Sequence, residues 1–228
     1  MSRTTHTTGF TILELAVVLC VLVVLTVFFT TSRRMGCTLN GQVQSNNQLR
    51  GIHQNLFVYG YEHETDSNSL YFPGLDKTGQ PTDLTVENRF HLMLDDNLYS
   101  PDYLISPKEN TGKSAWSAGP FTDKHYSYAM LQVPKEGGRY DEWQETLNAD
   151  AIVLSDRNTG RNTTNQISSL QTQPNSGQWE GGVCYNDNHV TTEDTTHFET
   201  KYGGIHNKHD HLFEPTGRDD AYLIHRGN

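Results

Sequence analysis

Histidines and carboxylates gather near the C-terminal end of the chain, and these are side chains that ligate metal ions. Five of the 11 histidines lie at or beyond position 197. Three of them sit close enough for one loop to wrap a zinc or nickel ion: His206, His209 and His211. Asp187 and Asp219 are hard oxygen donors that suit calcium, although no EF-hand spacing is present. The sequence therefore offers zinc and calcium as candidate ligands.

Our prediction is that no cofactor is bound and that residues 199–220 form a polar, metal-free loop, with zinc or calcium binding as the alternative. Glycines and polar side chains offer little apolar area to offset the entropy of ordering, so such a loop is expected to be mobile. The adjacent Leu212 and Phe213 form its large apolar pair, and we expect them to pin the loop to the rest of the domain.

Covalent chemistry has little support in the sequence. Cys184 and His189 could be a nucleophile and a base, but neighbouring positions in a hairpin explain them equally well, and no catalytic motif is present. The sequence therefore predicts no enzymatic activity. A disulfide between Cys37 and Cys184 could form in an oxidising compartment, and two unpaired thiols are the alternative.

A single carboxylate interrupts a long apolar run near the N-terminus. Residues 10–29 are apolar except for Thr11, Glu14 and Thr26, and as a helix they would span about 30 Å. A carboxylate is costly in an apolar span, so Glu14 needs a reason and a partner. A plain membrane anchor and a secretory signal peptide are two interpretations, although no A-x-A-like cleavage site follows the run.

The third interpretation is a resemblance. Gly9-Phe10-Thr11-Ile12-Leu13-Glu14, followed by the aliphatic run, resembles the start of type IV prepilins and type II secretion pseudopilins. This resemblance implies that prepilin peptidase cleaves between Gly9 and Phe10, that Phe10 is N-methylated, and that Glu14 supports assembly. A carboxylate paired with the N-terminal amine of a neighbouring subunit would offset the cost of burying both charges and would set the axial stagger.

A second resemblance lies near the C-terminus. Many bacterial pilin-like proteins carry a processing-associated signature near the C-terminus. It has the form H-S-G-G-x-N-V, then any three residues, then D-G-H-V. Val183, Asp187, His189 and Val190 match this spacing. The match is degenerate, because Asn175 stands where the signature has His and Asn188 where it has Gly.

The remaining pattern predicts an α+β fold, with one long N-terminal helix packed on a mostly antiparallel sheet. The first half of this helix, residues 10–30, would be transmembrane. The second half, residues 31–59, would be amphipathic. Its apolar stripe consists of Leu39, Val43, Leu49, Ile52, Leu56 and Tyr59. A leader, 1–9, would precede it, and a head domain, 60–228, would follow. In the head we expect a helix over 87–97, capped by Asp83 or Thr85, and strands at 126–133, 151–155, 182–185, 189–191 and 221–225.

Composition limits the range of functions. The net charge is −10, from 17 basic and 27 acidic residues, which argues against direct nucleic-acid binding. The prediction is a structural subunit of a pilus-like or pseudopilus filament, placed in the bacterial inner membrane with its head in the periplasm or in an extracellular filament. The resemblance implies prepilin peptidase, other pilin-like subunits, an inner-membrane assembly platform and the membrane as partners. The alternative is a membrane-anchored binding module that forms no filament.

Overall fold

A computed structural model describes residues 12–64, 70–160, 167–173, 178–215 and 223–225, apart from the side chains of 27–40. The chain divides into two compact units, Met1–Asn40 and Gly41–Asn228. Helix α1 extends over Ile12–Glu62 and contributes to both units. Each unit is therefore described by itself.

The first unit presents the apolar run of α1. Large aliphatic side chains from Ile12 to Leu25 are exposed, including Ile12 at 89% and Leu13 at 76%. Glu14 lies in the first turn of the helix. A long series of exposed aliphatic side chains, interrupted by one carboxylate, is typical of a surface that associates with another apolar surface.

The predicted transmembrane helix over residues 10–30 is wrong. Among the residues that the structure describes, no helix is both long and apolar enough to cross a membrane. The predicted fold class fails in this element, and the single-pass inner-membrane localisation fails with it.

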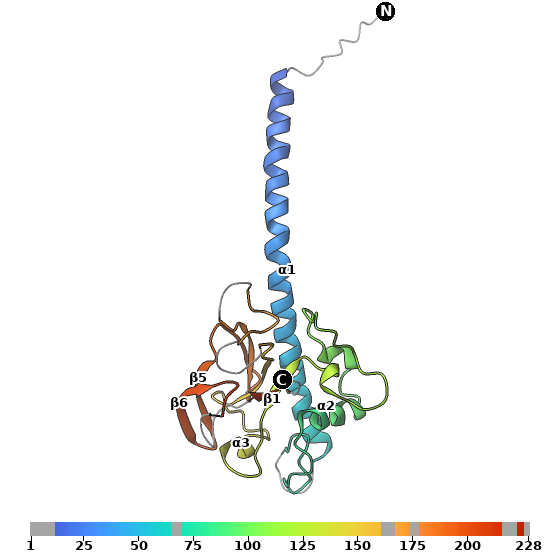
Figure 1. Ribbon diagram of the computed structural model, residues 1–228, viewed down its shortest axis with the longest axis vertical. Coiled ribbons are helices and arrows are strands. Elements are labelled where there is room, and N and C mark those ends of the chain that lie inside the picture. Colours follow the sequence, from blue (N-terminus) through green and yellow to red (C-terminus); the bar gives the residue numbers. More distant parts are fainter. Residues whose placement is uncertain (1–11, 65–69, 161–166, 174–177, 216–222, 226–228) are drawn as a thin grey trace, which may run out of the picture. The chain divides into compact units, whose positions relative to one another are not determined.

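The second unit contains the hydrophobic core, and the last part of α1 supplies one side of it. Leu49, Ile52 and Leu56 are fully buried and Tyr59 nearly so, whereas Val43 is 58% exposed. Figure 1 shows this part of α1 passing between α2 on one side and the hairpin β5–β6 on the other. The compact unit therefore begins at Gly41 rather than at residue 60, because these helical side chains complete its core.

A polar network also ties α1 to the sheet. Ser45 donates a hydrogen bond to Asp156 Oδ1 at 2.8 Å, and Tyr128 donates one to Gln48 Oε1 at 2.8 Å. The other oxygen of Asp156 accepts the backbone N–H of Gly182 at 2.8 Å. Burial raises the pKa of Asp156, and these donors partly oppose the shift. The network fixes which face of the helix meets the sheet.

The main sheet has the strand order β4-β3-β2-β1-β7, and its pairings are antiparallel. Its strands are β1 (Tyr128–Leu131), β2 (Ile152–Asp156), β3 (Gly181–Tyr185), β4 (Val190–Glu193) and β7 (Leu223–Ile224). Every residue of β2 is buried, and β2 lies in the middle of the order. The prediction of a central strand at 151–155 is confirmed, because only a strand covered on both faces tolerates a continuous apolar run.

The hairpin β3–β4 closes where the sequence predicts a turn. Asn186, Asp187 and Asn188 connect its strands, and Asn188 has φ = 69°. Asparagine adopts this left-handed conformation more readily than most residues. The predicted hairpin is therefore confirmed together with its turn chemistry.

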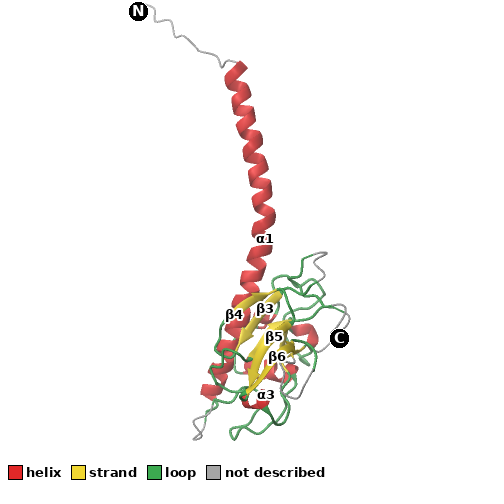
Figure 2. Ribbon diagram, turned by 90° about the vertical axis from the view of Figure 1, so that its left-hand side faces the viewer, coloured by secondary structure: helices red, strands yellow, loops and turns green. Residues whose placement is uncertain are grey.

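A second hairpin is present where the sequence predicts a mobile loop. Strands β5 (His197–Tyr202) and β6 (Ile205–His211) pair antiparallel, and Figure 2 shows them beside the main sheet. The turn is Gly203–Gly204, with φ values of 53° and 84°. Two consecutive glycines suit a two-residue turn in which both φ values are positive. The prediction of a disordered polar loop is wrong in this segment, because the backbone pairs with itself.

Helical segments surround the sheet. Helix α2 spans Val86–Asp95, and its N-cap Thr85 accepts the N–H of Asn88 at 3.3 Å, as predicted for one of the two candidate caps. The short helices are η1 (Pro101–Leu104), η2 (Asp123–His125) and α3 (Gly138–Asp141). The buried face of α2 carries Val86, Arg89, Phe90, Met93 and Leu94.

Candidate functional site

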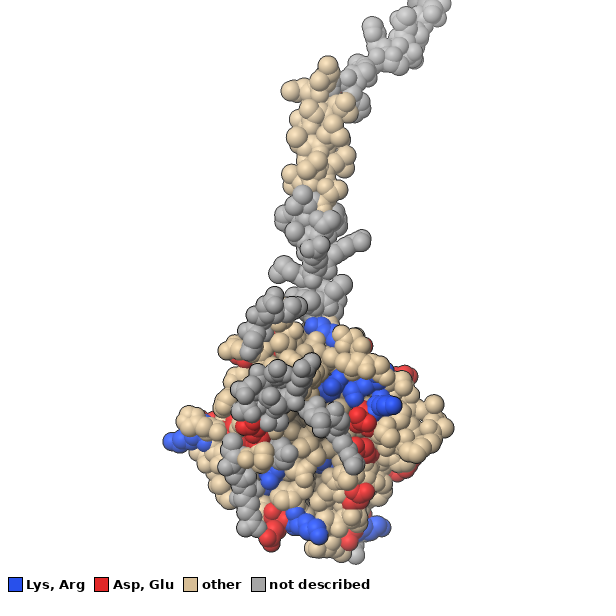
Figure 3. Space-filling model, in the orientation of Figure 1, with Lys and Arg blue, Asp and Glu red and all other residues tan. Residues whose placement is uncertain are grey.

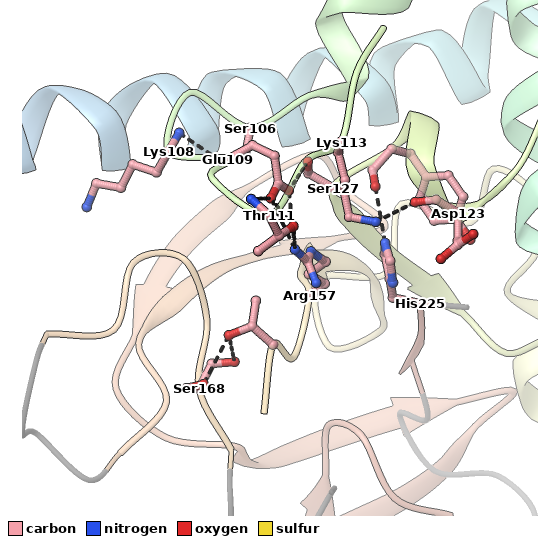
Figure 4. Close-up of polar contacts among 12 residues, drawn as sticks. Ser106, Lys108, Glu109, Thr111, Lys113, Asp123, Ser127, Arg157, Ser168 and His225 are labelled. Carbon is pink, nitrogen blue, oxygen red and sulfur yellow. Dashed lines mark hydrogen bonds and ion pairs between the residues drawn. The ribbon is translucent and has the colours of Figure 1, made fainter. Parts of the chain in front are cut away.

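A buried ion pair connects a loop before β1 to the end of β2. Arg157 Nη2 lies 3.3 Å from Glu109 Oε1, and the two side chains are 9% and 3% exposed. Ser127 also donates to Glu109 at 2.7 Å, and the backbone N–H of Thr111 donates at 3.0 Å. Figure 4 shows these four side chains converging on one point. The cluster ties the loop around Glu109 to the sheet.

The protonation state of Glu109 follows from these contacts. Burial alone would raise the pKa of its carboxyl. Hydrogen bonds from Thr111 and Ser127, together with the charge of Arg157, outweigh burial and hold the pKa at about 2. Glu109 is therefore ionised at neutral pH and has no proton to donate there.

Lys113 and His225 lie beside this pair. Lys113 donates to the backbone oxygen of Asp123, and burial lowers its pKa to about 8, with Arg157 adding to the effect. Nε2 of His225 lies 3.1 Å from the backbone oxygen of Tyr126 and therefore carries the hydrogen. Burial and the charge of Lys113 lower the pKa of His225 to about 3, so at neutral pH its Nδ1 is a hydrogen-bond acceptor.

A cavity of about 950 Å³ lies next to His225. Its described lining comes from residues 81–87 around the start of α2, from residues 132–135 after β1, and from Asn158, Phe213, Leu223, Ile224 and His225. Half of these side chains are apolar and the others are polar or charged. Such a mixed lining, in a cavity at the upper end of the usual ligand-site size, suits binding of an amphipathic ligand.

The sequence-predicted nucleophile does not lie in this cavity. Its described lining contains neither serine nor cysteine. Cys184 is buried elsewhere, in β3, and burial raises its pKa, so its thiol is a poor nucleophile. His189 Nδ1 contacts Asp187, and its ring stacks on Tyr185 with centroids 4.1 Å apart. The hypothesis that Cys184 and His189 act as nucleophile and base therefore gains no support from their positions.

Several predicted site residues are not covered by the description. Gly9, Phe10 and Asp219 lie outside the described residues, as does the side chain of Cys37. Cys184 is a free thiol. Glu14 is exposed in the first turn of α1. Processing at Gly9 and the assembly role of Glu14 therefore stay predictions.

The candidate metal ligands are not brought together. His206 Nε2 pairs with Glu199 at 2.8 Å, whereas His211 Nε2 lies 3.1 Å from Thr196 Oγ1 and its Nδ1 accepts the N–H of Phe213. His209 is exposed on the same strand, and Asp187 lies in the β3–β4 turn. In the described part of the chain, no group of three or more His, Cys, Asp or Glu side chains could hold a metal ion. His206 and His211 instead face separate partners, Glu199 and Thr196.

Sequence reasoning missed the ion pair and the cavity. Glu109 and Arg157 are far apart in the chain and belong to no local pattern, so no sequence signal could have paired them. The Gly203–Gly204 dipeptide, by contrast, was a usable hairpin signal. The predicted apolar pair is confirmed as buried, with Leu212 at 0% and Phe213 at 4% exposure, and the ring of Phe213 packs edge-on against Trp179.

Comparison with known proteins gives no relative. No protein-family model, curated protein or solved structure matches this chain.

Proposed function

We propose that this chain is a structural subunit of a pilus-like or pseudopilus filament, cleaved by prepilin peptidase between Gly9 and Phe10. The observation that carries the proposal is the exposed aliphatic segment Ile12–Leu25, with Glu14 in its first turn. It begins within the motif Gly9–Glu14, which resembles a prepilin cleavage site. The exposed segment supports assembly because packing it against other copies would remove a large apolar area from water.

Glu14 supplies specificity in this proposal. Cleavage would create a free amine on Phe10, four residues before Glu14. This amine could pair with Glu14 of a neighbouring subunit. A carboxylate and an amine that are buried between helices stabilise each other only when the helices adopt one stagger. The pair would therefore select the register, while the aliphatic side chains would supply most of the association free energy.

The test combines two variants with one control. Gly9→Leu should block cleavage, which mass spectrometry of the mature N-terminus would detect as an intact leader. Glu14→Leu should leave cleavage unchanged and abolish or strongly reduce filaments seen by electron microscopy of sheared material. Leu19→Ile, which keeps the exposed apolar area, should behave as wild type. Normal filament yield from Glu14→Leu would contradict the register role, and an uncleaved wild-type chain in cells with active peptidase would contradict the processing.

A binding module that forms no filament is the second candidate, and the cavity beside α2 favours it. Absence of filaments together with saturable binding at the cavity would support this alternative. The compact Gly41–Asn228 unit presents mixed acidic and basic residues on the face shown in Figure 3, without one dominant charge. This surface suits specific recognition better than general electrostatic attraction.

A further inference from the structure

The cavity beside α2 has a lining that divides its charges between two segments of the chain. Asp83 and Glu87 come from the segment that starts α2, and Lys135 comes from the segment that follows β1. We propose that this cavity binds a short peptide with free termini and apolar side chains, its carboxylate at Lys135 and its amine at Asp83 and Glu87. This inference does not depend on filament assembly.

The basic segment has groups available for a carboxylate. Lys135 is exposed, and no hydrogen bond or ion pair engages its ammonium group within the described residues. The side-chain amide of Gln132 is likewise without a partner there, although its backbone oxygen accepts from Arg139. An ammonium and an amide N–H that line one cavity can together bind a carboxylate by charge-assisted hydrogen bonds.

The acidic segment would attract the other end of the ligand. Asp83 Oδ1 accepts the N–H of Thr85 at 2.9 Å, which holds this carboxylate beside the N-cap of α2. Glu87 lies in the first turn of the same helix. Because His225 is neutral, the described lining carries two negative charges and one positive charge. A ligand with a positive end therefore meets two carboxylates, which also interact with the charge of the buried Arg89.

The apolar part of the lining would hold the side chains of the peptide. Val133, Phe213 and Leu223 are each at most 4% exposed and line the cavity together with Ile224 and Leu84. Nδ1 of His225 can accept a hydrogen bond, which a peptide N–H can donate. The volume of about 950 Å³ exceeds what a single amino acid needs and fits a peptide of several residues.

Calorimetric titration of the purified full chain with the tetrapeptide Ala-Leu-Ala-Leu tests the proposal. We expect saturable binding to the wild type, and binding at least about fivefold weaker when the same peptide is acetylated and amidated. Lys135→Gln should weaken binding of the free peptide by a similar factor. Lys208→Gln is the matched control, because Lys208 is exposed on β6 and lies outside the cavity lining.

A filling variant tests the location independently of charge. Ile224→Trp should reduce the cavity volume and abolish binding. If Ile224→Trp does not fold, Gln132→Leu is the second variant, and it should weaken binding because it removes the side-chain amide. Circular dichroism establishes that each variant is folded. No saturable binding by the wild type, equal binding of the capped peptide, or wild-type affinity in Lys135→Gln would each overturn the proposal.

Discussion

Strand β2 and the hairpin β5–β6 are stabilised by different interactions. All five residues of β2 are buried, and it has a paired strand on each side. In the hairpin, by contrast, the buried polar residues Thr200, Asp210 and His211 do much of the packing. Thr200 donates to Asp210, and His211 contacts Thr196. Buried apolar side chains therefore dominate the first three positions of β2, whereas the hairpin combines the buried Tyr202 with side-chain hydrogen bonds.

The two regions meet at Tyr202. Its hydroxyl accepts the N–H of Ile152 at 2.9 Å and donates to the backbone oxygen of the same residue at 2.7 Å. The β2–β3 pairing shifts register between Ile152 and Leu154, and the β1 pairing begins only at Leu154. The hydroxyl of Tyr202 therefore forms hydrogen bonds with the backbone N–H and C=O of Ile152, which β1 does not pair with.

The largest effect should come from the central strand. Leu154→Ala removes a fully buried side chain from β2 and should reduce the free energy of unfolding by about 2–5 kcal/mol, because the surrounding strands cannot close the cavity. Urea denaturation measures the change. Leu147→Ala is the control, since Leu147 is 62% exposed and should lose little. Equal losses in the two variants would show that β2 is not the stabilising centre.

A smaller effect is expected at the junction of the two regions. Tyr202→Phe keeps the ring in place and removes the hydroxyl that bonds to Ile152, which leaves two buried backbone groups without this partner. The expected loss is about 1–3 kcal/mol in the free energy of unfolding. Tyr61→Phe is the matched control at a side chain that is 61% exposed. Hydrogen exchange should also become faster at Ile152, and unchanged exchange there would argue against the bridging role.

The smallest effect concerns buried and exposed histidines. Burial lowers the pKa of His53 to about 4, and the charge of Asp187 opposes this shift. Burial lowers the pKa of His225 to about 3. The charges of Lys113 and Arg157 add to the shift at His225, and that of Glu109 opposes it. Because the unfolded chain binds these protons near pH 6.5, stability should fall as the pH drops from 7 to 5. The expected loss is on the order of 1–2 kcal/mol for each buried histidine at pH 5.

Variants separate this effect from general acid sensitivity. His53→Gln and His225→Gln should each show a smaller loss of stability between pH 7 and 5 than the wild type, whatever their stability at pH 7. His206→Gln is the control at an exposed histidine in the hairpin β5–β6. Glu109, with a pKa of about 2, loses its stabilising charge only at lower pH. Parallel pH profiles for all three variants would contradict the assignment.

Local signals in the sequence determined several elements of this protein. Thr85 at the N-cap of α2, Asn188 in the β3–β4 turn and the continuous apolar run of β2 act through neighbouring atoms, so each could be predicted and was found. Leu212 and Phe213 were predictable as a buried pair because large apolar side chains leave water wherever the chain allows. The hairpin β5–β6 escaped prediction because its strands lack apolar alternation, although its two glycines mark the turn.

Tertiary structure alone decided the rest. Glu109 meets Arg157, Tyr202 meets Ile152, and Asp83 shares a cavity with Lys135, and none of these pairs is close in the sequence. Their contacts depend on how the antiparallel sheet packs against α1 and α2. The hydrophobic effect that drives this packing is non-directional, so it does not specify which polar groups come together. Local sequence signals were therefore sufficient for a cap, a turn and a buried strand, whereas packing brought the distant polar groups together.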